Sequence, residues 1–309
     1  MKSIATVTMN PTIDVSYDVG RMRHTHKMRT DNEWYAPGGG GINVARVFVR
    51  LGGHARCYYL SGGATGSALD GLIDLHQLVR TRIPIAGPTR VASAVFERGS
   101  GKEYRFVPKG PHVAESEWRE CLDRLAEAEC DYIVLSGSLS PGVPDDFYAR
   151  VAELLCPRGI GIVLDSSGAA LAAGIEAGGL ALVKPSQGEL RGYVGRPLDS
   201  VEEIGETAMA IVEAGKAHLV AVTMGHEGAL LARKEGPVFL PAVEIEAASA
   251  VGAGDSFVAG MVFGLASGQD ELEAFRLGLA AGTAAVLRAG AGLAHPEDVE
   301  RLLARIQPL

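Results

Sequence analysis

The chain has 309 residues, of which 47% are hydrophobic and 21% charged, a balance typical of a globular protein. Its formal net charge of −8 argues against a broad nucleic-acid-binding surface, so an anionic ligand must be held by local groups. The N-terminal residues read as a strand, and no apolar run reaches membrane-spanning length. We therefore expect a cytoplasmic protein that binds neither nucleic acid nor membrane. Its four cysteines form no CxxC pair, which predicts reduced thiols.

Apolar strand-like runs alternate with helical patterns along most of the chain. The predicted strands are Ile4–Thr8, Ala55–Leu60, Tyr132–Ser136, Gly161–Asp165, Leu180–Lys184 and Leu219–Thr223. The predicted helices are Ile42–Leu51, Glu115–Ala128, Asp145–Leu155, Gln187–Val194 and Val201–Ala214. Past Gly225 we expect two short strands, Ala229–Arg233 and Pro237–Leu240, and then three helices. This alternation predicts an α/β fold with a mostly parallel sheet covered on both faces, in a single domain spanning residues 1–309.

Two segments, at about residues 14–36 and 90–107, do not fit this layered pattern. The second alternates like a hairpin that turns at Gly99–Gly101. Surface loops are one interpretation, and a small β-lid projecting from the sheet is the other. The cations Lys27, Arg90 and Arg105 favour the lid, with Trp34 and Tyr35 packed at its base.

A run of four glycines opens the first predicted helix, in "PGGGGINVARVFVRLGG" at residues 37–53. Such a run indicates either positive φ angles or close approach of a ligand to the backbone. It is neither a dinucleotide fingerprint, which needs a glycine where Asn43 stands, nor a P-loop. A turn that packs a helix on a strand and a ligand-binding helix start, with Asn43 bonding a hydroxyl, both stay open.

Four strand ends carry polar residues and together predict a crevice at one edge of the sheet. They are "SGSLSPGVP" at 136–144, Asp165, "KPSQGE" at 184–189 and "TMGHEG" at 223–228. Asp165 either touches a ligand or caps a helix at Gly168–Ala177. Ser186 and Glu189 have capping-box spacing, while Glu189 would alternatively help to place hydrated Mg²⁺.

The stretch "VGAGDSFVAG" at residues 251–260 starts a helix that is apolar around its whole circumference. Capping is the simple interpretation of Asp255. The alternative is a general base beside an anion site, because Gly252 and Gly254 free the helix N–H groups for a phosphate. Capping explains Asp255 but leaves both glycines unexplained.

These motifs, with "YRFVPKG" at 104–110, occur in the same order as the signatures of the ribokinase-like, or PfkB, family of carbohydrate kinases, which the chain resembles from residue 4 to about 290. Within that family the four-glycine run and "YRFV" are most similar to the PfkB-type 6-phosphofructokinases. The resemblance implies a ribokinase-like three-layer α/β/α core with a β-lid, ATP and Mg²⁺ as cosubstrates, and a homodimer formed through the lids. It also implies a monovalent cation site, for K⁺, near the anion hole.

The resemblance also implies a role for individual residues. Asp255 matches the catalytic base, and Gly252, Ala253 and Gly254 match its anion hole. The residues that match the sugar-phosphate side are Asp14, Lys27, Gly39, Gly40, Asn43, Arg90, Arg105 and Ser138. Those that match the ATP side are Lys184, Ser186, Thr223, Gly225 and Gly228, with Glu189 on Mg²⁺ through water.

The sequence departs from the family pattern at three places. Ser186 replaces the asparagine of "KPN", Ser249-Ala250-Val251 replaces Asp-Thr-Thr before the anion hole, and Ser140 stands where proline is common. The first bears on the Mg²⁺ contact and the second leaves the K⁺ site open. We expect phosphoryl transfer from ATP to fructose 6-phosphate, with tagatose 6-phosphate or fructose 1-phosphate as alternatives. The hypothesis from another functional class is a non-catalytic protein that binds a sugar phosphate as a sensor.

Overall fold

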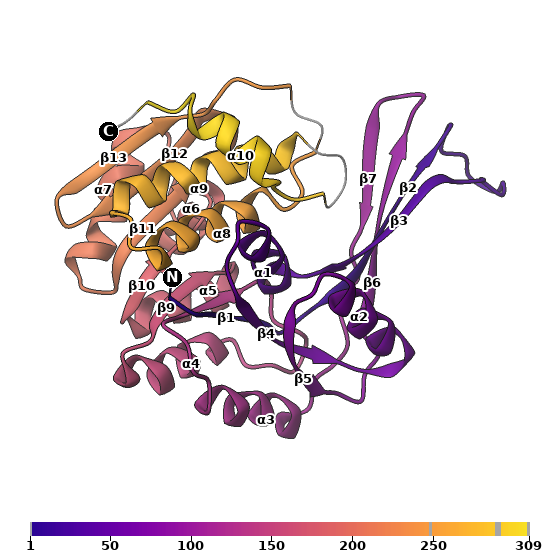
Figure 1. The fold of residues 1–309 in the computed structure, drawn as a ribbon, viewed down its shortest axis with the longest axis horizontal. Coiled ribbons are helices and arrows are strands. Elements are labelled where there is room, and N and C mark those ends of the chain that lie inside the picture. Colours follow the sequence, from indigo (N-terminus) through magenta and orange to yellow (C-terminus); the bar gives the residue numbers. More distant parts are fainter. Residues whose placement is uncertain (1, 247–248, 288–291, 308–309) are drawn as a thin grey trace.

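A computed structural model describes residues 2–246, 249–287 and 292–307, and within them the central sheet has nine strands. The order is β13-β12-β11-β10-β9-β8-β1-β4-β5, parallel throughout except for the antiparallel β12 and β13 (Figure 1). The strands are β1 (Ile4–Thr8), β4 (Ala55–Ser61), β5 (Val79–Pro84), β8 (Tyr132–Ser136), β9 (Gly161–Asp165), β10 (Leu180–Val183), β11 (Ala217–Thr223), β12 (Gly228–Arg233) and β13 (Gly236–Pro241). This confirms the predicted mostly parallel α/β sheet.

Alternate residues of each strand pack into two separate hydrophobic clusters, one on each face of the sheet. Ile4 and Val134 belong to the first cluster, and their neighbours Ala5 and Ile133 belong to the second. The first cluster contains α1 (Gly40–Arg50), α2 (Gly63–Leu75), α8 (Ala253–Ala266), α9 (Glu271–Val286) and α10 (Pro296–Leu303). The second contains α3 (Glu115–Ala126), α4 (Phe147–Leu155), α5 (Gly168–Ala177), α6 (Gln187–Val194) and α7 (Val201–Glu213). Because strand side chains point alternately to opposite faces, the result is a three-layer α/β/α fold.

Helix α8 is buried on nearly all sides, as its sequence predicts. Glycine is required at Gly260, where a Cβ would lie 2.7 Å from the Leu277 carbonyl oxygen of α9. The absence of that side chain lets the two helices pack closely. The close packing holds most of α8 in the interior, whereas its N-terminus, with Asp255 in the first turn, is half-buried.

A second sheet of four strands projects beside the central sheet (Figure 1). Its order is β3-β2-β6-β7, formed by β2 (Thr12–Val19), β3 (Asp31–Gly38), β6 (Arg90–Glu97) and β7 (Lys102–Phe106). Both predicted lid segments therefore contribute a pair of antiparallel strands, and β2 joins the pairs by running parallel to β6. Trp34 and Tyr35 are 39% and 50% exposed instead of packed at the base, because they lie on the edge strand β3.

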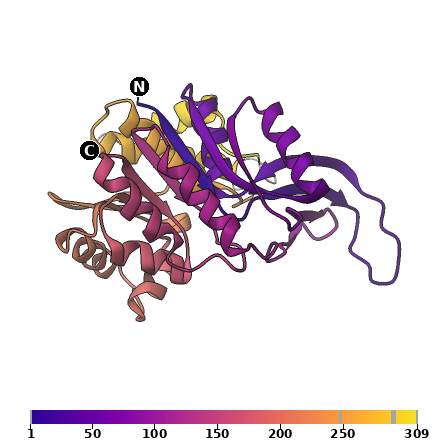
Figure 2. The same ribbon diagram turned by 90° about the horizontal axis from the view of Figure 1, so that it is seen from below.

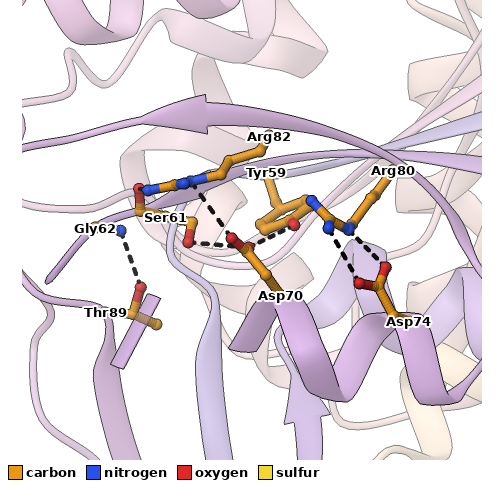
Figure 3. Close-up of polar contacts among 8 residues, drawn as sticks. All are labelled: Tyr59, Ser61, Gly62, Asp70, Asp74, Arg80, Arg82 and Thr89. Carbon is orange, nitrogen blue, oxygen red and sulfur yellow. Dashed lines mark hydrogen bonds and ion pairs between the residues drawn. The ribbon is translucent and has the colours of Figure 1, made fainter. Parts of the chain in front are cut away.

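The predicted strand and helix bounds agree with the structure to within two residues, but the sequence prediction omitted α2 and β5. Helix α2 contains three glycines, which weaken its helical pattern. It is held on the sheet by Asp70, whose carboxylate accepts hydrogen bonds from Tyr59 (2.7 Å) and Ser61 (3.2 Å) (Figure 3). Asp70 also pairs with Arg82 of β5 at 3.6 Å (Figure 3). Within the described residues no helix has the length and apolar character needed to cross a membrane.

Candidate active site

Four neighbouring strands, β8, β9, β10 and β11, end in a polar residue or are followed directly by one, at one edge of the sheet. Parallel neighbouring strands finish at the same edge, so the structure brings the four predicted strand ends together. Asp165 and Lys184 form a buried ion pair there, with 3.0 Å between Oδ1 and Nζ. The hydroxyl of Ser136 donates to the other oxygen of Asp165 at 3.4 Å.

The sequence predicts two alternative roles for Asp165, contact with a ligand and capping of a helix, and the structure rules out the second. Helix α5 has Ser167 as its N-cap residue and no side-chain capping bond, so the prediction that Asp165 caps it is wrong. The carboxylate instead points toward Lys184, whose burial alone would favour the neutral amine. Burial is outweighed by the carboxylates of Asp165, Glu189 and Asp255, which raise the pKa of Lys184 above its ordinary value.

The glycine run places the start of α1 in close contact with two polar side chains. Gly39 has a φ of +106°, which other residues rarely adopt. A side chain at Gly38 would collide with the Asp14 carboxylate, and one at Gly40 would collide with the Ser136 hydroxyl. Packing on the sheet therefore accounts for part of this run. It also leaves the backbone at the helix start facing Asp14 and Ser136.

Asp255 lies in the first turn of α8 but does not cap that helix. The N-cap residue is Gly252, with a φ of +72° and no side-chain capping bond. The first helical bond runs from the Ser256 N–H to the Gly252 carbonyl, so the N–H groups of the residues between them have no helical acceptor. Asp255 Oδ2 instead accepts a hydrogen bond of 2.9 Å from the amide of Asn43. The predicted capping role is therefore not observed.

The environment of Asp255 suits a base at neutral pH. Burial raises the pKa of Asp255 to about 7, and the negative charge of Asp165 adds to this effect. The Asn43 hydrogen bond and the charge of Lys184 act in the opposite direction. A carboxylate with a pKa near the working pH is well matched to general-base catalysis.

Arg46 is a site residue that the sequence prediction missed. The residue is 1% exposed, and its guanidinium donates from Nη1 to the carbonyl of Pro37 (2.9 Å) and to Oδ1 of Asn43 (3.2 Å). The available signal was its place in "NVAR", three residues after Asn43 and amid the apolar residues of the same helix.

The lid contributes Asp14, Arg90 and Arg105 to the same region. Burial raises the pKa of Asp14 to about 6, against the opposing charges of Arg46, Arg105 and Arg90. A small cavity is lined by Asp14 and Arg105 from the lid and by Val251 from the segment before α8. The lid is therefore adjacent to the start of α8.

Arg90 lies in a shallow depression that also contains Ser138. Its guanidinium donates to the carbonyls of Pro108 (2.9 Å) and Asn10 (2.7 Å), while its buried Nε has no partner among the described residues. The side-chain amide of Asn10 is 3.3 Å from the Ser138 hydroxyl. The structure thus brings the predicted Arg90 and Ser138 together.

Lys27 is not brought to this group of residues. It lies in the loop between β2 and β3, which Figure 2 shows extending away from the rest of the molecule. Asp14 is the third residue of β2, and strands rise roughly 3.3 Å per residue, so the rest of the strand and part of the loop separate the two residues. The structure therefore does not place Lys27 beside Arg90 and Arg105 of the same chain.

The predicted nucleotide side lies at the ends of β10 and β11. Ser186 and Glu189 form the expected capping box of α6: Ser186 Oγ accepts from the Glu189 N–H at 3.2 Å, and Glu189 Oε2 accepts from the Ser186 N–H at 2.7 Å. Ser186 also forms a parallel bridge to Thr223. Gly225 and Gly228 have φ angles of +59° and +132°. A surface hollow runs along Ser186 and Glu189.

A closed metal site is not part of this arrangement, because the described residues contain no group of three or more His, Cys, Asp or Glu side chains placed to hold an ion. Mg²⁺ that arrives with a nucleotide keeps several waters and needs only one or two carboxylates. Asp165 and Glu189, both close to Lys184, are consistent with that donor set.

The model of the pfkB family of carbohydrate kinases matches residues 5–298. The chain belongs to this family. It is similar to ATP-dependent 6-phosphofructokinase isozyme 2 of Mycobacterium tuberculosis, with 40% identity over 96% of this chain and 88% of that protein. It is also similar to 1-phosphofructokinase of Bacillus subtilis, with 31% identity over 98% of each chain.

The fold of this pfkB-family kinase matches that of phosphofructokinase-2 from Escherichia coli. The crystal structure of that protein in complex with potassium has 36% identity and a TM-score of 0.94, and covers 99% of both chains. Its complex with fructose-6-phosphate has 35% identity and a TM-score of 0.93 over the same coverage. A tetrameric inhibited form of the E. coli protein matches with a TM-score of 0.93, 35% identity and 99% of both chains. The predicted family and ribokinase-like fold are confirmed.

Proposed function

We propose that this kinase is an ATP-dependent 6-phosphofructokinase, which converts fructose 6-phosphate and MgATP to fructose 1,6-bisphosphate and MgADP. The observation that carries the proposal is the half-buried Asp255, with a pKa near 7, in the first turn of α8, where no side chain caps the helix. The chain is similar to 6-phosphofructokinase isozyme 2 of M. tuberculosis and to phosphofructokinase-2 of E. coli. The E. coli protein was crystallised with fructose-6-phosphate, which supports this choice of substrate.

In the proposed mechanism Asp255 accepts the proton of the sugar's C1 hydroxyl as the hydroxyl oxygen attacks the γ-phosphorus of ATP. The new O–P bond forms as the bond from the γ-phosphorus to the β–γ bridging oxygen breaks, and ADP leaves with that oxygen. The N–H groups of Ala253, Gly254 and Asp255 would stabilise the negative charge on the transferring group, since they have no helical acceptor. Closure by the lid would exclude water from the reaction.

The sugar phosphate would bind between the lid and the start of α1. Asp14, Asn43 and the backbone of Gly39 and Gly40 would bind hydroxyl groups. Arg90 and Arg105 would bind the 6-phosphate, with Ser138 beside them. Arg90 has an unpartnered Nε among the described residues, which supports a ligand there, because buried polar atoms normally have a partner.

ATP would lie along the ends of β10 and β11. Lys184 would neutralise its phosphates, while Ser186, Thr223 and the backbone of Gly225 and Gly228 would line its path. Glu189 uses Oε2 in the capping box, and its second oxygen would bind Mg²⁺ through water. Mg²⁺, when bound, would offset the charge on the phosphates.

A K⁺ site and a lid-mediated homodimer belong to the same proposal. The turn before Gly252 is closed by a bond of 3.3 Å from the Val251 N–H to the Ser249 hydroxyl. The E. coli protein forms a complex with potassium, which supports a K⁺ site in this chain.

The dimer is supported by the exposed side chains of Tyr35, Val91 and Phe106, which strand register places on one face of the lid. In such a dimer the projecting Lys27 would reach the partner's site. A cytoplasmic location stays a prediction from the sequence.

An ADP-release assay with MgATP tests the proposed function across fructose 6-phosphate, tagatose 6-phosphate, fructose 1-phosphate, fructose and ribose. We expect the highest kcat/KM with fructose 6-phosphate, and phosphorus NMR should identify the product as the 1,6-bisphosphate. Preference for fructose 1-phosphate would instead assign a 1-phosphofructokinase, the activity named for the B. subtilis relative. Equal turnover of unphosphorylated sugars would refute the phosphate-binding role of the lid. Binding without any ADP release would indicate a sensor.

A further inference from the structure

Arg46 is a buried cation whose presence in the apolar helix α1 needs a reason. It is among the largest fully buried side chains, on a helix otherwise rich in Val, Ile and Phe. Burying a charged group without full hydrogen bonding is costly. Nε and Nη2 of Arg46 have no partner within the part of the chain that the structure describes. The contacts that Nη1 does make, to Pro37 and Asn43, therefore indicate what the residue does.

The hydrogen-bond chemistry of arginine determines which way round the Asn43 amide lies. A guanidinium only donates, so the atom of Asn43 that faces Arg46 at 3.2 Å must be the carbonyl oxygen. The NH₂ group of the same amide must then face Asp255, which accepts it at 2.9 Å. A carboxylate that accepts an N–H bond is stabilised in its ionised form. A reversed amide would present its oxygen, which only a protonated Asp255 can bond.

We propose that Arg46 is a positioning residue, which locks the amide of Asn43 in the orientation that keeps Asp255 ionised and ready to accept a proton. The proposal rests on the function proposed above, since it concerns the base of that reaction. Arg46 is 1% exposed and acts through its hydrogen bond to Asn43. The positive charge of Arg46 also interacts with the carboxylates of Asp14 and Asp255.

Other charged groups also influence this pair and must stay constant in any test. Asp255 is influenced by Asp165 and Asp14, which disfavour its ionised form, and by Lys184, which favours it. The charge of Arg46 is influenced by Arg50, Asp14 and Asp255, and itself acts on His76. None of these side chains is changed in the variants below.

The test is the pH dependence of kcat/KM with fructose 6-phosphate for Arg46→Met, from pH 5.5 to 9.5. Without Arg46 to orient the Asn43 amide, we expect the apparent pKa of the acid limb to rise by about one unit. A carboxylate that loses a favourable charge or hydrogen bond shifts its pKa by about this much. The kcat/KM of the variant should be about tenfold below the wild-type value at pH 6 and should equal it above pH 8.5. Arg46→Gln, which can both donate and accept, carries the same expectation if Arg46→Met does not fold. Arg46→Lys, a cation that only donates, should keep the limb within about 0.3 units.

Arg276→Met is the matched control, because Arg276 is a second buried arginine with an unpartnered Nε, on α9. It bonds Glu273 and the Ile306 carbonyl, away from Asn43, so its loss should reduce stability without moving the limb. A limb that stays in place in Arg46→Met and Arg46→Gln, with activity reduced equally at every pH, would overturn the inference. Absence of turnover by the wild-type protein would instead refute the proposed function.

Discussion

Asp70 of α2 and Asp255 of α8 are two carboxylates on helices, and they differ in how fully they are bonded. Both oxygens of Asp70 have partners, from Tyr59, Ser61 and Arg82. Asp255 accepts one hydrogen bond from the described residues, from Asn43, and burial raises its pKa to about 7. A carboxylate whose two oxygens both have partners stabilises the fold, whereas one with few partners and a shifted pKa is available for chemistry. The predictions below are ranked by how strongly they separate these two cases.

Asp255→Asn should have the largest effect. An amide cannot accept the hydroxyl proton, so we expect kcat to fall by about 10²–10⁴-fold with little change in sugar-phosphate binding. Steady-state ADP release and calorimetric binding of fructose 6-phosphate measure the two quantities. Asp70→Asn is the matched control, and its kcat should stay within about twofold of the wild-type value. Near-normal turnover in Asp255→Asn would remove this residue from the mechanism.

Arg90→Met extends the comparison to arginines. Arg90 keeps an unpartnered Nε among the described residues, whereas Arg82 pairs with Asp70. A charge-assisted bond to phosphate contributes about 1.5–3 kcal/mol, so KM for fructose 6-phosphate should rise by about 10–100-fold. Arg82→Met, measured in parallel, should change KM by less than about twofold. Equal KM changes in the two variants would show that Arg90 does not bind the phosphate.

Asp70→Asn should show its effect in stability rather than in catalysis. The amide keeps one acceptor oxygen but loses the ion pair with Arg82, so we expect the free energy of unfolding to fall by about 1–3 kcal/mol. Urea unfolding followed by circular dichroism measures it. A stability equal to the wild-type value, or a large loss of kcat in a folded variant, would contradict the structural role of Asp70.

Local sequence patterns predicted most of the fold, because strand and helix periodicities depend on neighbouring residues. Helix α6 and strands β1, β8 and β9 lie at their predicted bounds. Helix α2 was missed because glycines interrupt its pattern, and Asp70, which fixes it to the sheet, acts through partners on other elements. Elements that depend on tertiary contacts are therefore the ones that sequence reading omits.

The candidate site was predictable where a motif carries its own geometry. Ser186 and Glu189 form the predicted capping box because both partners lie within four residues. The Asp165–Lys184 pair joins residues that follow different strands, so strand order had to be known first. The direction in which the loop bearing Lys27 projects is likewise a property of the folded sheet, and no spacing in the sequence specifies it.

The pH dependence of kcat/KM for fructose 6-phosphate tests the central claim most directly. The base must be ionised, so activity should be retained above the pKa and should fall tenfold per pH unit below it. With a pKa of about 7 for Asp255, we expect an acid limb with an apparent pKa near 7, and protonation of Asp14, whose pKa is about 6, should steepen the fall at lower pH. The residual activity of Asp255→Asn should lack the Asp255 contribution to this limb. A wild-type profile that is flat from pH 5 to 8, or a limb identical in Asp255→Asn, would contradict the account.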